Sequence, residues 1–317
     1  MQTVTLARNA MATRFELVLH GNRSVALRAA GEEAFAEVTR LENQLSLYRP
    51  GSEITQLNRR AAREAVRVTP ELFTLLQHAQ HLHAATQGAF DITVAPLVRC
   101  WGFMGDGGKF PAPEEVAAAH ENVGMQYVQL EVADRTVRFA RDGVMLDLGA
   151  IGKGYAVGQA AKILREAGVT SALIHGGTST VYAIGSPPDA PAWKLAIEEP
   201  PAATHTPGFP DFPFVSLRDE ALSISAIWGR SFEANGKSFG HVIDPRTGQP
   251  TAAALLAAVV LTSAPETDAL STALLTLGRT GLDRIANLRP GCRGLVVSRE
   301  AGAISLAKRG FSDSETR

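Results

Sequence analysis

The chain has 317 residues, of which 45% are hydrophobic and 20% are charged, and its formal net charge at pH 7 is −1. This balance excludes a strongly basic nucleic-acid-binding protein and a protein held on an anionic membrane surface by charge. No stretch of the sequence approaches the roughly 20 consecutive apolar residues that a membrane-spanning helix requires.

In the first half of the chain, the hydrophobic pattern predicts strands and two helices. Alternating apolar residues predict half-buried strands near residues 4–6 and 15–19. Apolar residues recur at helical spacing over 27–45, and the segment "YRPGSE" supplies a Pro-Gly turn that ends this helix. A second helix is predicted from Pro70, capped by Thr69, to about Ala85. Further strands are predicted at 127–132, 136–140 and 144–148.

The second half of the chain continues with short strands and few helices. A helix is predicted over 154–168, and residues 199–214 are Pro-rich and predict a surface loop. A further helix over 263–278 precedes a short helix near 281–288 and a closing hairpin. Strands and helices do not alternate strictly, which predicts an α+β fold with antiparallel sheets. The remaining predicted strands are 171–175, 181–185, 193–197, 221–225, 239–243 and 255–263.

The helix over 263–278 carries two polar residues on one face. Asp268 and Thr272 are four residues apart and therefore lie one turn above the other. One interpretation is structural, because an acidic residue near a helix start often acts as a cap or dipole partner. Ser263 and Thr267 are alternative caps of the same helix. The other interpretation is a hard-cation site, because carboxylate and hydroxyl oxygens are ligands that Mg²⁺ accepts.

Two further segments place polar groups next to turns. In "FGHVIDPRTGQP", residues 239–250, His241 precedes a tight turn, although a lone histidine is more often structural than catalytic. In "MLDLGAIGKGYAVG", residues 145–158, a Gly-rich turn leads into a helix near Lys153. This arrangement is typical of phosphate-binding turns in kind, although it lacks both the P-loop and the G-x-G-x-x-G spacing.

Another segment, "GAFDITVAPLVRCWGF" at 88–103, places Asp91 and Thr93 among apolar residues. Buried polar groups need hydrogen-bond partners, and these partners are either backbone groups or a ligand. The sequence contains no H-E-x-x-H or EF-hand motif, and its one G-x-S-x-G is the segment "GKSFG" at 236–240. This segment leads into the predicted strand 239–243 and not into the helix that follows a nucleophile elbow. A serine hydrolase, a zinc protease and a calcium sensor therefore have no support.

Six segments in register resemble the ApbE family, the FAD:protein FMN transferases. They extend over nearly the whole chain, and the resemblance implies an ApbE-like α+β fold of two intertwined subdomains, each of mostly antiparallel sheet with flanking helices. No linker divides the chain, so we expect a single domain over 1–317. The segments are "MATRF" (11–15), "LSLYRPGSEITQLN" (45–58), "GAFDITVAPLVRCWGF" (88–103), "DLGAIGKGYAV" (147–157), "GHVIDPRTGQP" (240–250) and "TDALSTALLTLG" (267–278).

The resemblance implies Mg²⁺-dependent cleavage of FAD and transfer of FMN to a Thr or Ser hydroxyl of a target flavoprotein, with release of AMP. The implied partners are FAD and this acceptor, with no nucleic acid. His241 would activate the acceptor hydroxyl, and Asp268 would be catalytic through the metal. The implied metal ligands are the Ala150 carbonyl, Asp268 and Thr272, and the implied FAD contacts are Met11, Tyr48, Ala89, Phe90, Asp91, Asp147, Lys153 and Val242. By residue type, Tyr48 offers a surface for a ring, and Asp91 an acceptor for the adenine amino group.

The sequence departs from the family pattern at three places. Ile224-Ser225-Ala226 replaces Thr-Ser-Gly, Thr178 follows two glycines in place of Asp or Glu, and Gly158 replaces a frequent Asp. The altered segment 224–226 keeps open a non-catalytic flavin-binding protein. An FAD pyrophosphatase, in which water replaces the acceptor hydroxyl, also stays open, because the same residues serve both chemistries.

The cysteines and the start of the chain bear on the compartment. Cys100 and Cys292 form no disulfide framework, and we expect both to be small core residues, which fits a reducing compartment. The first residues show no secretory signal and no cysteine that could carry a lipid. We therefore expect a cytoplasmic location for the chain as written, and a periplasmic one if a leader has been trimmed.

Overall fold

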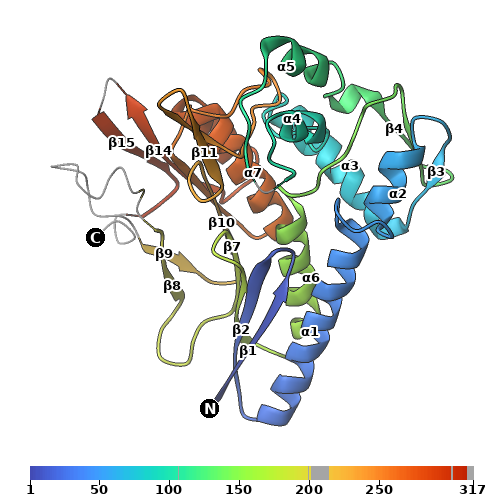
Figure 1. Ribbon diagram of the computed structural model, residues 1–317. Coiled ribbons are helices and arrows are strands. Elements are labelled where there is room, and N and C mark those ends of the chain that lie inside the picture. Colours follow the sequence, from blue (N-terminus) through green and yellow to red (C-terminus); the bar gives the residue numbers. More distant parts are fainter. Residues whose placement is uncertain (106, 199, 201–213, 301–302, 313–317) are drawn as a thin grey trace.

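The computed structural model describes residues 1–105, 107–198, 200, 214–300 and 303–312, and its centre is an eight-stranded sheet (Figure 1). Each strand runs antiparallel to its neighbours. The strand order is β1-β2-β6-β7-β10-β13-β14-β15. The bounds are β1 Gln2–Ala10, β2 Thr13–Gly21, β6 Ser171–Gly176, β7 Thr180–Ile184, β10 Ala221–Ala226, β13 Leu256–Leu261, β14 Arg293–Glu300 and β15 Ala303–Arg309.

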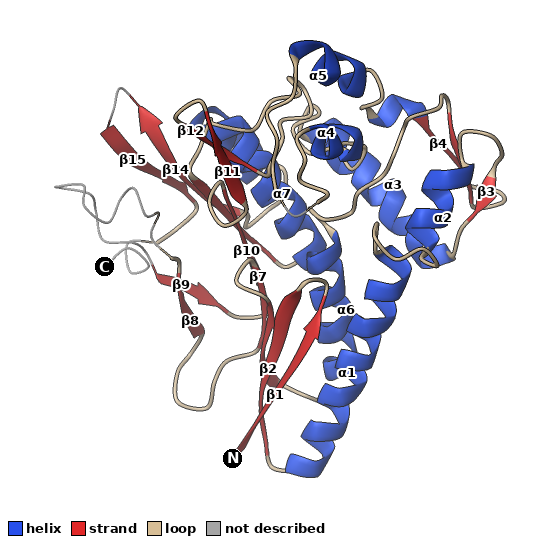
Figure 2. Ribbon diagram, in the orientation of Figure 1, coloured by secondary structure: helices blue, strands red, loops and turns tan. Residues whose placement is uncertain are grey.

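Three helices cover one face of this sheet: α1 (Ser24–Leu45), α6 (Gly152–Glu166) and α7 (Ala264–Leu277) (Figure 2). The apolar stripe of α1 is buried, with Leu27, Ala34 and Val38 all in the main hydrophobic core. The central strands send alternate side chains into that core. The periodicities of the helix and of the strands therefore meet in one layer between helices and sheet. A short helix α8 (Leu282–Asn287) follows α7 after the 3₁₀ turn η2 (Gly278–Gly281).

The opposite face of the sheet is covered in part by a two-stranded hairpin of β8 (Trp193–Ala196) and β9 (Phe214–Leu217). Trp193, Val215 and Leu217 pack there against Val181 and Leu222 in a second hydrophobic cluster. All six residues of β13 are buried, as expected for a strand that is covered on both faces.

The rest of the chain forms a smaller region beside α1, α6 and α7. It contains a three-stranded sheet in the order β3-β5-β4, four helices and a separate hairpin. The hairpin packs on a satellite cluster that includes Trp101 and Phe103. The bounds are α2 Glu53–Arg60, β3 Val66–Arg67, α3 Pro70–Ala85, α4 Ala95–Cys100, α5 Pro113–His120, η1 Met125–Tyr127, β4 Val128–Glu131, β5 Thr136–Phe139, β11 Ser231–Ala234 and β12 Lys237–Gly240.

The predicted α+β class with antiparallel sheets is confirmed, and the strand predicted at 144–148 is wrong. This segment belongs to no sheet, because its backbone bonds elsewhere. The Leu146 amide donates to Asn58 Oδ1 at 2.8 Å, and the Leu146 carbonyl accepts from Asn58 Nδ2 at 2.9 Å. The Asp147 amide donates to the Ile92 carbonyl at 2.7 Å.

Several smaller predictions are resolved by local geometry. Helices α2, α4 and α5 were not predicted, because each has only six or eight residues and shows too little periodicity. Thr69 precedes α3 as predicted, but its side chain makes no cap hydrogen bond and donates to Glu53 instead. Cys292 is buried and Cys100 is half-buried, and both are free.

Most of the Pro-rich segment 199–214 lies outside the described residues. None of the helices in the described part of the chain combines the length and the apolar character needed to cross a bilayer.

Candidate active site

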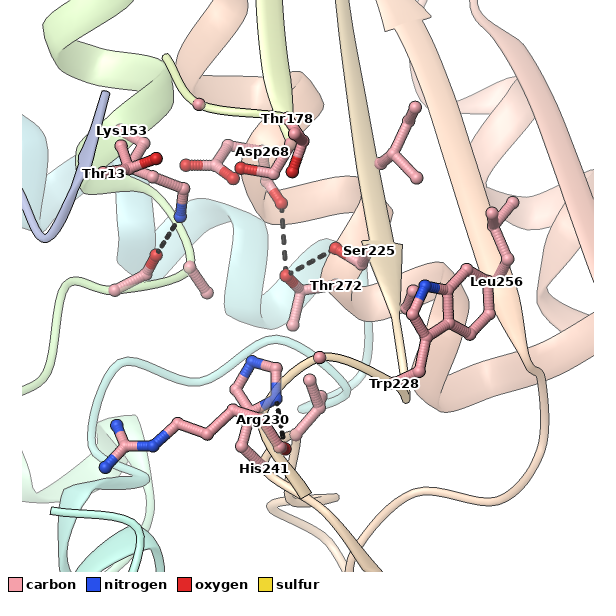
Figure 3. A pocket seen from close by; sticks show the side chains of 18 of the residues that line it. Thr13, Lys153, Thr178, Ser225, Trp228, Arg230, His241, Leu256, Asp268 and Thr272 are labelled. Atoms are coloured by element: carbon pink, nitrogen blue, oxygen red, sulfur yellow. Dashed lines mark hydrogen bonds between the residues drawn. The ribbon is translucent and has the colours of Figure 1, made fainter. Parts of the chain in front are cut away.

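One cavity of about 1080 Å³ collects nearly all of the predicted site residues. It lies where the large sheet, α6 and α7 meet the smaller region, and Figure 3 shows part of its lining. Its volume is at the upper end of the roughly 300–1,000 Å³ typical of ligand pockets. The predicted residues that line it are Tyr48, Ala89, Phe90, Asp91, Asp147, Ala150, Lys153, His241, Val242, Asp268 and Thr272.

Met11 is the predicted site residue that does not line this cavity. It forms the two-residue turn between β1 and β2 together with Ala12, and both have positive φ angles, 50° and 57°. Its side chain packs against the main core, while Thr13, two residues later, lines the cavity. A contact between Met11 and a flavin stays a prediction.

Asp268 connects the two helices that form the floor of the cavity. Its side chain is buried, and its Oδ2 accepts a hydrogen bond of 2.9 Å from the Gly154 amide near the start of α6. The interpretation of Asp268 as a cap of its own helix is therefore wrong. Ser263 occupies the N-cap position without a side-chain hydrogen bond, and the Thr267 hydroxyl donates to the Ala264 carbonyl.

Gly154 permits this contact because it has no side chain. A Cβ built there would lie 2.3 Å from the Ala264 carbonyl oxygen and 2.7 Å from the Asp268 Cβ. The starts of α6 and α7 therefore approach at backbone distance, which only glycine allows. This close approach places the glycine turn and the Asp268 carboxylate on the same side of the cavity.

A hydroxyl group of β10, that of Ser225, contacts the second predicted ligand, Thr272. The Ser225 hydroxyl lies 3.2 Å from the Thr272 Oγ1 and 2.8 Å from the Ser271 Oγ (Figure 3). The Thr272 hydroxyl also donates to the Asp268 carbonyl at 3.3 Å. Because Ser225 comes from a strand of the rigid sheet, it restricts the position of the Thr272 hydroxyl.

The residues present fit a Mg²⁺ ion by the chemistry of their donors. In the described part of the chain, no backbone amide donates to the Ala150 carbonyl, because the Gly154 amide that would normally reach it donates to Asp268. Ala150, Asp268 and Thr272 thus offer three oxygen donors on one cavity. No cluster of three or more His, Cys, Asp or Glu residues occurs in the described ranges, so a histidine- or thiolate-rich metal centre has no support there.

The glycine turn next to α6 carries one positive and one negative side chain. The Lys153 ammonium donates to the Gly149 carbonyl at 3.1 Å, and the Gly149 amide donates to Asp147 Oδ1 at 2.8 Å. Burial holds the pKa of the Asp147 carboxyl above its ordinary value, against the opposing effects of the Gly149 amide and the Lys153 charge. Lys153 therefore brings a cation to the cavity on a turn that is fixed by its own hydrogen bonds.

His241 follows β12 and lies across the cavity from this turn (Figure 3). Its Nδ1 lies 3.2 Å from the Arg230 carbonyl. A carbonyl oxygen only accepts, so Nδ1 carries the hydrogen and Nε2 keeps its lone pair. Burial lowers the pKa of His241, and the charges of Lys153 and Arg230 lower it further, against the hydrogen bond to Arg230. The imidazole is therefore a neutral base near pH 7.

Asp91 lies at another part of the cavity wall and is held from three directions. Its Oδ1 accepts from the Thr93 amide at 2.7 Å and from the Thr93 hydroxyl at 2.6 Å. Its Oδ2 lies 3.1 Å from His83 Nδ1, although the angle there is too poor for a directed hydrogen bond. Desolvation of the ring lowers the pKa of His83, but the Asp91 carboxylate and the Phe90 backbone together outweigh it, so the pKa is raised. Tyr48 is mostly exposed, which places its ring at the cavity mouth.

Several lining residues were missed by sequence reasoning. Thr13, Thr178, Trp228 and Arg230 contribute side chains to the cavity wall. Thr13 begins β2, Thr178 lies in the turn between β6 and β7, and the other two lie between β10 and β11. None has a spacing that indicates a site. The alternation of Ser223 and Ser225 on β10 is a usable signal, because both face α7.

Comparisons with known proteins identify relatives over most of the chain. The model of the ApbE family matches residues 11–296. The FAD:protein FMN transferase of Haemophilus influenzae is 27% identical over 318 residues, which cover 98% of this chain and 91% of that protein. The flavinyl transferase ApbE of Pseudomonas stutzeri, solved in its apo form, superposes with a TM-score of 0.84 at 27% identity, over 100% of this chain and 98% of that one. The ApbE protein of Thermotoga maritima gives a TM-score of 0.85 at 27% identity, over 96% of each chain.

Proposed function

Because the chain belongs to the ApbE family, we propose that it is an FAD:protein FMN transferase that moves FMN from FAD to a Thr or Ser hydroxyl of a target flavoprotein and releases AMP. Proteins named FAD:protein FMN transferase match nearly its whole length. The structure contributes the arrangement of the groups that this chemistry requires.

The observation that carries the proposal is the meeting of three kinds of group in one cavity. Asp268, Thr272 and the Ala150 carbonyl supply oxygen donors, Lys153 supplies a cation, and His241 supplies a neutral base. These residues come from α7, the glycine turn and the segment after β12, so only the folded chain brings them together. Phosphoryl transfer depends on positioning and on charge stabilisation more than on covalent catalysis by the protein.

The proposed transfer forms one P–O bond and breaks another. The acceptor hydroxyl oxygen attacks the phosphorus of the FMN half, and a new P–O bond forms to the acceptor. The bond between that phosphorus and the bridging oxygen breaks, and the bridging oxygen leaves with AMP. His241 Nε2 takes the proton of the acceptor hydroxyl, because Nδ1 is already committed to the Arg230 carbonyl. Lys153 stabilises negative charge on the phosphate oxygens.

We propose that Ala150, Asp268 and Thr272 hold Mg²⁺. When bound, the ion supplies charge neutralisation for the diphosphate of FAD. The buried Asp268 brings the negative charge that attracts a cation. The hydrogen bonds from Gly154 to Asp268 and between Ser225 and Thr272 restrict both side chains before any ligand arrives.

We also propose the FAD contacts that the sequence predicts, with support from the cavity lining for all except Met11. Asp91 offers an oxygen to the adenine amino group, and Tyr48 offers a ring surface at the mouth. We further propose a single domain, supported by a main core that includes residues of α1, α3, α6, α7 and the central sheet. The cytoplasmic location expected from the sequence stays a prediction.

The proposal is tested by incubating the protein with FAD, MgCl₂ and a flavoprotein domain that carries an acceptor threonine. We expect the acceptor band to be fluorescent in a denaturing gel, which shows that the flavin is covalently bound. One AMP should be released for each acceptor molecule labelled. Free FMN without a labelled acceptor would identify a pyrophosphatase instead. Tight FAD binding with no AMP release would identify a flavin-binding protein.

A further inference from the structure

The edge of β10 is open where this strand lines the cavity. β10 pairs with β13 along all of Ala221–Ala226, but it pairs with β7 only over Ala221–Ser223. Beyond that point lies the turn 177–179 that joins β6 to β7, and Ile224, Ser225 and Ala226 line the cavity. The sheet therefore presents a short unpaired edge inside the site.

The hydrogen-bond pattern identifies which backbone groups are free at this edge. The Ile227 amide donates to the Leu255 carbonyl, so the odd-numbered residues of β10 bond to β13. The Ile224 amide points the other way and donates to the Ser179 carbonyl at 2.7 Å. Within the described part of the chain, the Ile224 carbonyl and both backbone groups of Ala226 have no strand partner on that side.

Side chains on either side of this edge differ in chemistry. Ser225 points toward α7, where its hydroxyl meets Thr272 and Ser271. Ile224, one residue before, packs in the cluster on the other face of the sheet. In Figure 3, Trp228 and Leu256 lie on the opposite side of the β10 ribbon from Asp268 and Lys153. The cavity therefore has an outer apolar lobe lined by Val181, Leu195, Leu222, Ile224, Trp228 and Leu256.

We propose that the acceptor flavoprotein binds by adding an extended segment as a strand along this edge of β10. The inference rests on the proposed function, which requires a protein hydroxyl to enter the cavity. Free amide and carbonyl groups on a strand edge are a template for another polypeptide backbone. The proposed edge is continuous with the catalytic groups, because Ser225 on the same strand contacts Thr272.

The period of a strand then assigns the side chains of the acceptor. Successive side chains of an added strand point to opposite faces. When the acceptor Thr or Ser points toward Thr272 and His241, its two neighbours point into the outer lobe. An acidic neighbour would lose its hydration there without gaining a partner, because the acidic residue Glu198 also lines the cavity. The substrate class is therefore a hydroxyl residue in an extended segment, flanked by small or apolar residues and not by acidic ones.

The backbone part of the inference is tested by Ala226→Pro, which removes one edge amide and leaves the β13 ladder intact because that amide points away from β13. Ala226→Gly, which keeps the amide, is the conservative variant for comparison. The probes are FAD with MgCl₂ and a flavoprotein domain whose acceptor threonine the wild-type enzyme labels. We expect Ala226→Pro to raise the KM for the acceptor about 3- to 10-fold over Ala226→Gly, as for one lost hydrogen bond. The dissociation constant for FAD, measured by flavin fluorescence, should stay within about twofold, since the lost hydrogen bond is to the acceptor.

The side-chain part is tested by Trp228→Ala and Trp228→Phe. We expect Trp228→Ala to raise the KM for the acceptor. Trp228→Phe should have an acceptor KM close to that of the wild type, and the FAD affinity should be unchanged in both variants. Replacing the residue next to the acceptor threonine by Glu should reduce labelling more than replacing it by Leu. Unchanged FAD affinity also shows that the variants are folded.

Three results would overturn the inference. A weakened FAD affinity in Trp228→Ala with an unchanged acceptor KM would place the flavin ring, not the acceptor, in the outer lobe. An acceptor KM that is equal for Ala226→Pro and Ala226→Gly would exclude strand addition. Equal labelling of the Glu and Leu acceptors would exclude the apolar subsite. If the wild-type enzyme itself labels no acceptor, the proposed function fails instead, and the two failures are therefore distinct.

Discussion

The Asp268 carboxylate on α7 accepts a hydrogen bond of 2.9 Å from the Gly154 amide on α6, across 114 positions of sequence. This contact takes the amide that would otherwise bond to the Ala150 carbonyl. One interaction thus orients the carboxylate and leaves the carbonyl oxygen available. The close approach of α6 and α7 at Gly154 is therefore the structural basis of the proposed metal site.

Gly154→Ala is expected to separate the two helices. The added Cβ would meet the Ala264 carbonyl oxygen at 2.3 Å, and backbone atoms cannot rotate away as a side chain can. We expect a loss of about 1–3 kcal/mol in the free energy of unfolding, as for other overpacked sites, and a large loss of transfer activity. Urea unfolding and the gel fluorescence assay measure the two effects.

Gly158→Ala on the same helix is the matched control. Its Cβ would lie 3.5 Å from Pro265 Cδ and 3.8 Å from Ala264 Cβ, which are ordinary contacts. Because Ala is about 1 kcal/mol better than Gly inside a helix, this variant should be at least as stable as the wild type. Equal stability losses in the two variants would show that the close approach at Gly154 is not the cause.

Thr272→Val is expected to weaken the dependence on Mg²⁺ without unfolding the protein. Valine keeps the shape of threonine but removes the oxygen that we propose as a ligand. We expect the Mg²⁺ concentration for half-maximal activity to rise at least about tenfold, which corresponds to about 1.4 kcal/mol. Asp268→Ala should abolish turnover, because it removes the only charge among the three proposed ligands.

Thr276→Val is the control for the hydroxyl. Thr276 lies one turn further along α7, is buried, and donates to the Thr272 carbonyl at 2.9 Å, but it does not line the cavity. Its loss should leave the Mg²⁺ dependence unchanged. A titration in which Thr272→Val and Thr276→Val behave alike would contradict the metal assignment.

Glu266 is expected to contribute stability that depends on pH. Its Oε1 lies 3.0 Å from both His78 Nε2 and Arg289 Nη2, so it links α7 to α3 and to the segment after α8. The hydrogen bond from His78 is the largest cause of its lowered pKa, and Arg289 lowers it further, against desolvation. A carboxyl whose pKa is lower in the folded state stabilises that state above its unfolded value of about 4.3. The stability is lost as the pH falls through the folded pKa.

Glu266→Gln should therefore cost about 1–3 kcal/mol at pH 7, as expected for a buried, charged hydrogen-bond acceptor. The difference from the wild type should shrink when urea unfolding is repeated below about pH 4. Glu64→Gln is the control, because Glu64 pairs with Arg60 on the exposed surface and such pairs contribute at most about 1 kcal/mol. A cost at Glu266 that is the same at both pH values would refute this role of the charge.

The part of the fold that the sequence predicts is the part that local periodicity determines. The apolar spacing over residues 27–45 predicts α1, which the structure has at Ser24–Leu45. The segment 144–148 has the composition of a strand, but its backbone bonds to the Asn58 side chain, 88 positions away. No local pattern reports such a partner. Short helices such as α4 fail for a related reason, because six residues contain too few turns to show a period.

The site divides in the same way. Asp268 and Thr272 share a helix face, so their spacing alone places them together. The Gly154 contact of Asp268 and the Ser225 contact of Thr272 join separate elements, and they appear only once α6, α7 and β10 are packed. Residues brought in by turns, such as Trp228 and Arg230, carry no periodic signal at all.

His241 is expected to act as the general base of the transfer. The pH at which the transfer rate falls on the acid side should then depend on the charge of Lys153. The base must be neutral, so the transfer rate falls as the pH falls through the pKa of His241. Burial and the nearby charges lower this pKa below its ordinary value of about 6.5, so the rate at saturating FAD should stay on its plateau below that pH. Lys153→Met removes one of the charges that lower the pKa. The acid limb of kcat should therefore move to higher pH, separately from any change in the KM for FAD.

His241→Gln should lose the acid limb together with most of the activity, typically 10²- to 10⁴-fold for a general base. An acid limb in Lys153→Met that stays in place or moves to lower pH would exclude His241 as the group that titrates, because the removed charge acts on no other lining histidine as strongly as on this one.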